Sequence, residues 1–104
     1  MAKTLPTVAE TTRRILYQSH DVAVICFRWK KGDGLPVHHH YGKCIFQVLD
    51  GKLIEQRGQL QTVMYRNDIG KIEKGYSHSI EPITENALSL HIYSPPPTYL
   101  IPKK

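Results

Sequence analysis

The sequence from Gly32 to Gly51, GDGLPVHHHYGKCIFQVLDG, carries three consecutive histidines and a cysteine between glycine-rich ends. Successive side chains of a β-strand point to opposite faces, so a strand through this stretch would turn His38 and His40 to one side. If the strand continues to Cys44, the thiol faces that side too, because it lies four positions after His40. His39 faces the opposite side and is expected at the surface. The pattern predicts a strand face that lines a metal site, with a further ligand supplied elsewhere in the chain.

Length and composition indicate one small globular domain. The chain has 104 residues, of which 40% are hydrophobic and 22% charged, which is ordinary for a domain with a single core. The net charge of +5 is spread without a dense basic block, and no recognition motif accompanies it, so we expect no nucleic-acid partner. Two cysteines do not make a disulfide framework, and no apolar run suggests a signal peptide or a membrane span. We therefore expect a cytoplasmic domain over residues 1–104, with reduced thiols and no membrane partner.

Short β-rich segments separated by turn residues follow one another along the chain. We expect strands at residues 13–17 (at an edge), 22–29, 44–49, 52–57, 59–65, 69–73, 78–81 and 87–93, between a loose arm at 1–12 and a tail at 98–104. Turns are expected at residues 19–21, at Gly58 and at 67–68, and Asp50-Gly51 predicts a hairpin. No stretch of 11 residues shows a sustained helical period. The sequence therefore predicts an all-β antiparallel sandwich or barrel, and a small barrel can hold one ligand inside.

A fourth histidine completes a candidate ligand set. His78 follows a turn at Gly75 and precedes a short extended segment. With His38 and His40 it would give a metal three imidazole ligands. Three protein ligands leave positions open for chemistry, as in catalytic metal sites.

The last expected strand has an unusual polar face. Ser89, His91 and Tyr93 alternate with Leu90 and Ile92, so their three polar tips share one side of a hydrophobic segment. Buried polar groups need partners, so this side is expected to look onto a polar site. We expect His91 to lie beside the metal ligands rather than among them.

Two stretches resemble the paired motifs of the cupin superfamily. The histidine stretch resembles the first motif, with Cys44 at the position where most cupins have a glutamate ligand. EKGYSH at residues 73–78 resembles the second motif, whose histidine is the third protein ligand. The resemblance implies a small antiparallel double-stranded β-helix, the jelly-roll-like cupin barrel. It implies a metal site made of His38, His40 and His78.

The closing segment SLHIYSPPP, residues 89–97, is similar to the C-terminal signature of the cysteine dioxygenase family. These cupin iron enzymes oxidise a thiol to a sulfinate. The resemblance implies an Fe(II) cofactor, with a small thiol and O2 as substrates. It also implies that Ser89, His91 and Tyr93 form a relay near the iron, and that a thioether joins Tyr93 to Cys44.

Two further features follow from the same resemblance. In that family an arginine upstream of the first motif pairs with the substrate carboxylate. Arg13 is the nearest counterpart by spacing, and Arg14 is the alternative. The family's Ser-Pro bond after the tyrosine is often cis, so Ser94–Pro95 is expected to be cis as well.

The residues leave two interpretations of function. Three neutral imidazoles leave a ferrous ion its full charge, which favours an anionic ligand such as a thiolate. The first interpretation is an iron-dependent thiol dioxygenase that acts on cysteine or a similar small thiol carboxylate. The second is a small metal-binding cupin that acts as a ligand-binding or sensor module without oxidising a thiol, because imidazole sites accept several metals. The sequence does not indicate an oligomeric state.

Overall fold

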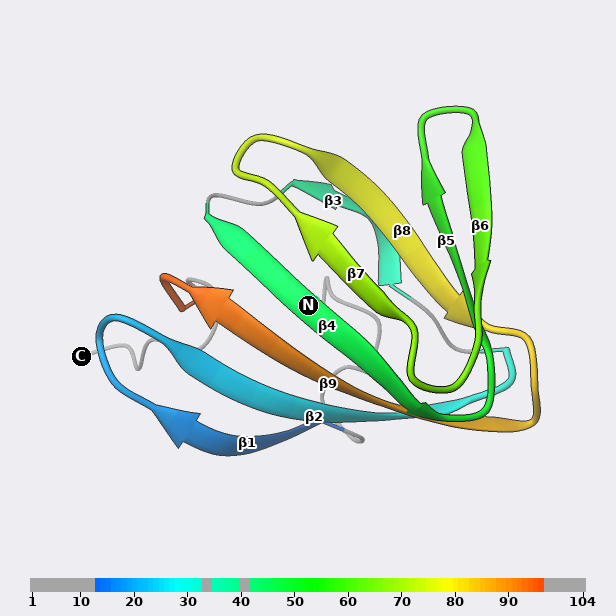
Figure 1. Ribbon diagram of the computed structural model, residues 1–104, viewed down its shortest axis with the longest axis horizontal. Coiled ribbons are helices and arrows are strands. Elements are labelled where there is room, and N and C mark those ends of the chain that lie inside the picture. Colours follow the sequence, from blue (N-terminus) through cyan, green and yellow to red (C-terminus); the bar gives the residue numbers. More distant parts are fainter. Residues whose placement is uncertain (1–12, 33–34, 40–41, 97–104) are drawn as a thin grey trace, which may run out of the picture.

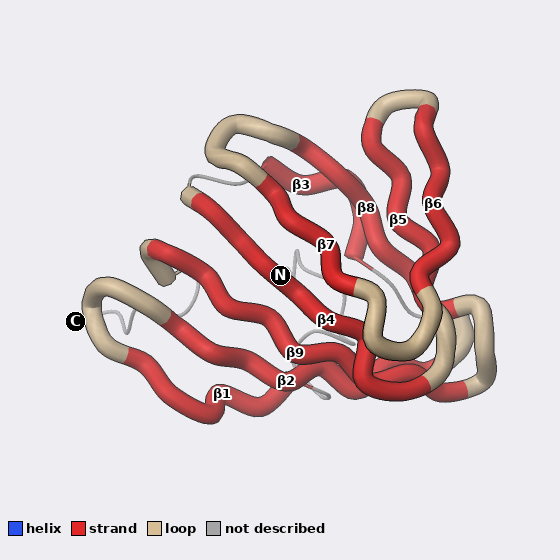
Figure 2. The backbone as a smooth tube through the Cα atoms, in the orientation of Figure 1, coloured by secondary structure: helices blue, strands red, loops and turns tan. Residues whose placement is uncertain are grey.

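The protein is built from β-strands throughout the part of the chain that is described. The structure, a computed structural model, describes residues 13–32, 35–39 and 42–96, with residues 35–39 described by their backbone alone. This part holds nine strands and no helix (Figures 1 and 2), so it contains no helix able to cross a membrane. The all-β prediction is confirmed. The arm expected at residues 1–12 and the tail expected at 98–104 lie outside the described residues.

Two antiparallel sheets form the domain (Figure 1). One has the order β1-β2-β9-β4-β7 and the other the order β3-β8-β5-β6. The strands are β1 (Arg13–Gln18), β2 (Ala23–Lys30), β3 (Leu35–His39), β4 (Lys43–Asp50), β5 (Leu53–Arg57), β6 (Leu60–Met64), β7 (Ile69–Ile72), β8 (Ser77–Pro82) and β9 (Asn86–Ser94). Their bounds lie close to the expected ones, with β1 at a sheet edge as predicted. Residues 35–39 form a strand of their own.

The expectation of one extended strand from His38 to Cys44 is wrong. β3 ends at His39 and β4 begins at Lys43, and the two strands belong to different sheets. The chain bends at Gly42, where an added Cβ atom would collide with the ring of Pro95. The thiol of Cys44 therefore comes from the five-stranded sheet, whereas β3, which contains His38, belongs to the four-stranded sheet.

The Asp50-Gly51 segment is a turn, but it does not form the predicted hairpin. Gly51 has a positive φ of 74°, yet β4 and β5 lie in different sheets. The turn is held instead by the loop before β9: the amide of Lys52 donates to Thr84 Oγ1 at 3.1 Å, and the amide of Ile83 donates to the carbonyl of Lys52 at 3.0 Å. These bonds carry the chain from one sheet to the other. The expected Ser94–Pro95 cis bond is present.

The core lies between the inner faces of the two sheets. Buried and more exposed residues alternate along β2, β4 and β9, as expected for strands with one face on the core. The apolar core residues are Ala23, Ile25, Phe27, Trp29, Cys44, Phe46, Val48, Leu53, Met64, Ile72, Ile80, Ala87 and Tyr93. Four polar or charged residues are buried with them: Glu55, His78, Ser89 and His91. A small core that holds four such groups must supply partners for each of them.

Candidate functional site

Cys44 and Tyr93 lie opposite one another on neighbouring strands inside the barrel. They are Cα partners in the pairing of β4 with β9. Directly paired residues of an antiparallel ladder project to the same face with their Cβ atoms roughly 5 Å apart. Only 1% of Cys44 and 7% of Tyr93 is exposed. The register thus brings a thiol and a phenol together in the interior.

Three polar side chains of β9 form a buried hydrogen-bonded line. Ser89 Oγ lies 2.9 Å from His91 Nε2, and Tyr93 Oη lies 3.4 Å from His91 Nδ1. All three residues are buried, so the expected polar inner face of this strand is confirmed. The line ends at the phenol beside Cys44.

Aromatic rings hold the imidazole of His91 on two sides. The ring of Phe46 stacks on it, with centroids 5.0 Å apart and planes inclined by 16°. The ring of Phe27 lies 4.6 Å away at a tilted angle. These contacts fix the plane of the imidazole, and hence the direction of its two nitrogens.

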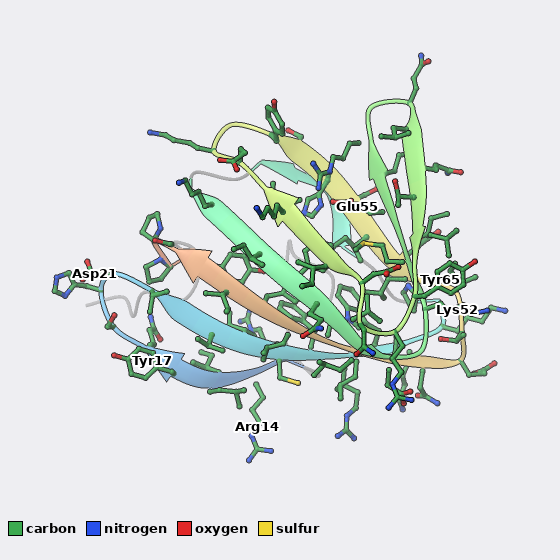
Figure 3. All side chains as sticks on the ribbon, viewed as in Figure 1. Arg14, Tyr17, Asp21, Lys52, Glu55 and Tyr65 are labelled. Atoms are coloured by element: carbon green, nitrogen blue, oxygen red, sulfur yellow. The ribbon has the colours of Figure 1, made fainter. Side chains whose placement is uncertain are left out.

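A buried carboxylate, which sequence reasoning missed, contacts His78. Glu55 Oε2 lies 2.8 Å from His78 Nδ1, and both side chains are almost fully buried. Glu55 is the cross-strand partner of Ile80 in the pairing of β5 with β8, so it is a diagonal neighbour of His78. In Figure 3 Glu55 lies within the body of the molecule, near β8. A signal existed in the sequence, because alternation from Leu53 places Glu55 on the inner face of its strand.

Arg57 completes this group. Its Nε lies 3.0 Å from Glu55 Oε2, and its Nη2 donates to the carbonyl of Lys71 at 2.6 Å. Burial would raise the pKa of Glu55, but hydrogen bonds from His78 and Arg57 outweigh burial and hold the pKa below its usual value. Glu55 is therefore a carboxylate at neutral pH and accepts the Nδ1 proton of His78.

This arrangement fits a metal-ligating histidine. Such histidines usually donate one ring N–H to a carboxylate or carbonyl, which fixes the tautomer and leaves the other nitrogen to coordinate. For His78 that nitrogen is Nε2. The Cα atom of His38 is opposite that of His78 in the pairing of β3 with β8. The side chain of His38 and the whole of His40 lie outside the described residues.

The environment of Cys44 keeps its thiol protonated. Burial, followed by the nearby charge of Glu55, raises the pKa of Cys44 to about 12. At neutral pH Cys44 is thus a neutral group next to Tyr93.

The two candidate arginines face opposite ways. Arg13 is the partner of buried Phe27, whereas Arg14 is the partner of Cys26, on the outer side of β2. The Nη1 atom of Arg13 is buried, and Arg14 is exposed and projects away from the sheets (Figure 3). Of the two, only Arg13 lies on the interior side of its strand.

Solved structures share this fold. No protein-family model matches the chain, and no curated protein matches its sequence. An RmlC-like cupin from Shewanella frigidimarina matches with a TM-score of 0.79 at 18% identity, over 88% of this chain and 91% of that one. KdgF from Halomonas sp. matches with a TM-score of 0.78 at 17% identity, over 86% and 83%. A cupin superfamily protein from Desulfitobacterium hafniense matches with a TM-score of 0.75 at 17% identity, over 79% and 74%. The chain therefore has the cupin fold, a small antiparallel β-barrel.

We predict that Glu55→Gln weakens divalent metal binding by about tenfold or more, because loss of an outer carboxylate typically has such an effect. The change keeps the shape of the side chain and removes its charge. Competition with a chromophoric chelator, using Zn²⁺ and Fe²⁺ in turn, measures the affinity. Glu81→Gln is the matched control, because Glu81 is an exposed carboxylate on β8. Equal losses in the two variants would contradict the role given to Glu55.

We also predict a pH-dependent stability term from Cys44. Because its pKa is raised in the folded state, the folded protein keeps a proton that the unfolded chain releases above about pH 8.5. Stability is therefore lost as pH rises above that value, at up to about 1.4 kcal/mol per pH unit. Urea titrations of protein without a thioether should show a steeper fall for wild type than for Cys44→Ala. A wild-type slope in Cys44→Ala would refute the assignment.

Proposed function

We propose that the protein is an iron-dependent thiol dioxygenase that acts on cysteine or a similar small thiol carboxylate. The reaction adds both atoms of O2 to the thiol sulfur and gives a sulfinic acid, so no further reductant is needed. The observation that carries this proposal is the buried pair of Cys44 and Tyr93 at the end of the Ser89–His91 line. The cupin fold alone does not require such a pair. The resemblance of residues 89–97 to the cysteine dioxygenases implies it.

The proposed iron ligands are His38, His40 and His78. The support in the described residues is the buried Glu55 carboxylate on Nδ1 of His78, which suits coordination through Nε2. When bound, Fe(II) would favour the thiolate form of the substrate and supply the dioxygen chemistry. The part of the protein is to hold the substrate and to exclude competing ligands.

Cys44 contributes by remaining neutral. Most cupins have a glutamate where this chain has Cys44, and a carboxylate there would occupy a ligand position with its own negative charge. A buried thiol with a pKa of about 12 brings no such charge of its own. With Cys44 neutral, the substrate thiolate would be the anionic group that balances the charge of a bound Fe(II).

Tyr93 contributes a directed hydrogen bond. Its phenol is held by His91, which is held in turn by Ser89. A phenol fixed in this way can donate its Oη–H to a substrate beside it without rearranging during the reaction. We propose that this donor orients the reacting groups.

Arg13 is the proposed partner of the substrate carboxylate. A guanidinium can hold a carboxylate through two parallel hydrogen bonds, which fixes position as well as charge. The interior register of Arg13 and its buried Nη1 support this role over that of Arg14.

We expect the iron-loaded protein to consume O2 with cysteine or 3-mercaptopropionate and to form the sulfinate. Arg13→Ala should raise KM for these substrates by about 10- to 100-fold, because one charged hydrogen-bonding partner is lost. Its KM for cysteamine, which has no carboxylate, should change little, and Arg14→Ala should leave both unchanged. An oxygen electrode with product chromatography gives these values. Absence of uptake with every small thiol, together with full occupancy by zinc or nickel, would favour the non-oxidising module instead.

We further expect a thioether between Cys44 Sγ and the ring of Tyr93 after exposure to iron, thiol substrate and O2. The S–C bond replaces the thiol S–H and one ring C–H, and O2 accepts the two electrons and two protons. The intact mass should fall by two hydrogen atoms in wild type and stay constant in Cys44→Ser and Tyr93→Phe. A wild-type mass that never changes would remove the cross-link from the account.

A further inference from the structure

Trp29 lies at the far end of the hydrogen-bonded line from Tyr93. Its indole Nε1 donates to Ser89 Oγ at 2.9 Å, with both residues buried. An indole N–H can only donate. Trp29 therefore fixes which atom donates at its end of the hydrogen-bonded line. A serine, a histidine and a phenol can each donate or accept, so they do not fix this by themselves.

We propose that Trp29 sets the proton positions along this line, so that Tyr93 offers its O–H rather than a lone pair to the interior. The consequence for turnover rests on the function proposed above. The direction of the line is a property of this chain and can be measured without metal.

The contact with Trp29 decides whether the Ser89 hydroxyl donates to His91 or accepts from it. The indole N–H of Trp29 uses one lone pair of Ser89 Oγ, and His91 Nε2 lies 2.9 Å from the same oxygen. If Nε2 carried a proton, Ser89 would accept twice, and its own O–H would have no acceptor among the residues that the structure describes. A buried donor without an acceptor is unfavourable, because it has lost its hydrogen bonds to water and gained none in the protein. Ser89 therefore donates to Nε2.

The direction of the Ser89 hydrogen bond decides which ring nitrogen of His91 carries the proton. Since Nε2 accepts, the neutral ring carries its proton on Nδ1. An imidazolium is excluded by the same reasoning, because it would again make Ser89 accept twice.

The tautomer of His91 decides whether the phenol of Tyr93 accepts a hydrogen bond from the imidazole or donates one to it. With the proton on Nδ1, His91 donates to Tyr93 Oη across 3.4 Å, a long and weak bond. The phenol oxygen is then an acceptor on the side of His91, and its own proton is directed elsewhere. Tyr93 is paired with Cys44 across the sheet, so the phenol proton lies on the side of the ring that faces away from His91, in the interior that Tyr93 shares with Cys44.

Trp29 is thus a positioning residue that acts through Ser89 and His91. A Trp29 that only filled the core would affect stability but would leave the tautomer of His91 unchanged. The ring of Trp29 stacks on that of Phe27, with centroids 5.4 Å apart. A change at Phe27 therefore disturbs the packing of Trp29 without removing its N–H donor.

The test is ¹⁵N NMR of the histidine rings in metal-free protein, with His91 assigned from a His91→Gln variant. Wild type should show His91 protonated on Nδ1. Trp29→Phe keeps an aromatic ring and removes the donor, so the Nε2-protonated population should rise about fivefold or more. Phe27→Leu loosens the packing around the rings of Trp29 and His91. It removes no hydrogen-bond donor or acceptor, so the tautomer of His91 should stay as in wild type.

Two results would overturn the proposal: His91 protonated on Nε2 in wild type, or a tautomer that does not respond to Trp29→Phe. If Trp29→Phe fails to fold, Ser89→Ala interrupts the same line with a small volume change and should also release the tautomer. The wild-type spectrum remains decisive in either case.

Kinetics of the iron-loaded protein separate this proposal from the proposed function. Trp29→Phe should lower kcat about tenfold, less than the roughly 10²- to 10⁴-fold contribution of a positioned proton donor, because the phenol is redirected and not removed. It should have no further effect in a Tyr93→Phe background. Equal effects in both backgrounds would show that Trp29 does not act through Tyr93. If thiols are not oxidised at all, the proposed function fails while the NMR result still decides the direction of the line.

Discussion

The pairing register of β4 with β9 is the constraint on which the candidate site depends. It places Cys44 opposite Tyr93 and Phe46 opposite His91, so one inner face carries the thiol, the phenol and the imidazole. A slip of one residue would turn Ser89, His91 and Tyr93 outward, because side chains alternate along a strand. The register is strongly specified on the other strand as well, since a slip of β4 by one residue would expose Phe46 and Val48, which are fully buried.

The two sheets contribute different chemistry to one interior. The five-stranded sheet supplies the thiol–phenol pair and the hydrogen-bonded line behind it. The four-stranded sheet supplies His78 with its carboxylate, and His38 lies opposite His78 in the same sheet. The sheets face each other closely enough for the rings of Phe46 and His78 to lie 6.4 Å apart between centroids. A site assembled in this way requires closure of the barrel, because neither sheet holds both halves.

Local sequence patterns predicted most of the strands and the polar inner face of β9, because alternation and turn residues act over short distances. They did not predict which strands pair. The Asp50-Gly51 turn has the backbone of a tight turn, yet the bonds of Lys52 to the loop before β9 direct the chain into the other sheet. Likewise the bend at Gly42 depends on contact with Pro95, which is distant in sequence.

Contacts between distant parts of the chain were also what the sequence could not predict for the site. Cys44, His78, Ser89, His91 and Tyr93 could be proposed because their spacing resembles known motifs. Glu55 and Trp29 have no motif, and their roles come from partners 23 and 60 residues away in the chain. Such contacts exist only after the sheets have formed, so inward alternation could mark these two residues as buried but could not name their partners.

The proposed reaction places both atoms of O2 on one sulfur. Turnover of cysteine by the iron-loaded protein under ¹⁸O2, followed by mass spectrometry of the product, tests it most directly. We expect a sulfinate that carries two ¹⁸O atoms. A product with one or no labelled oxygen, or cystine as the sole oxidised product, would contradict it.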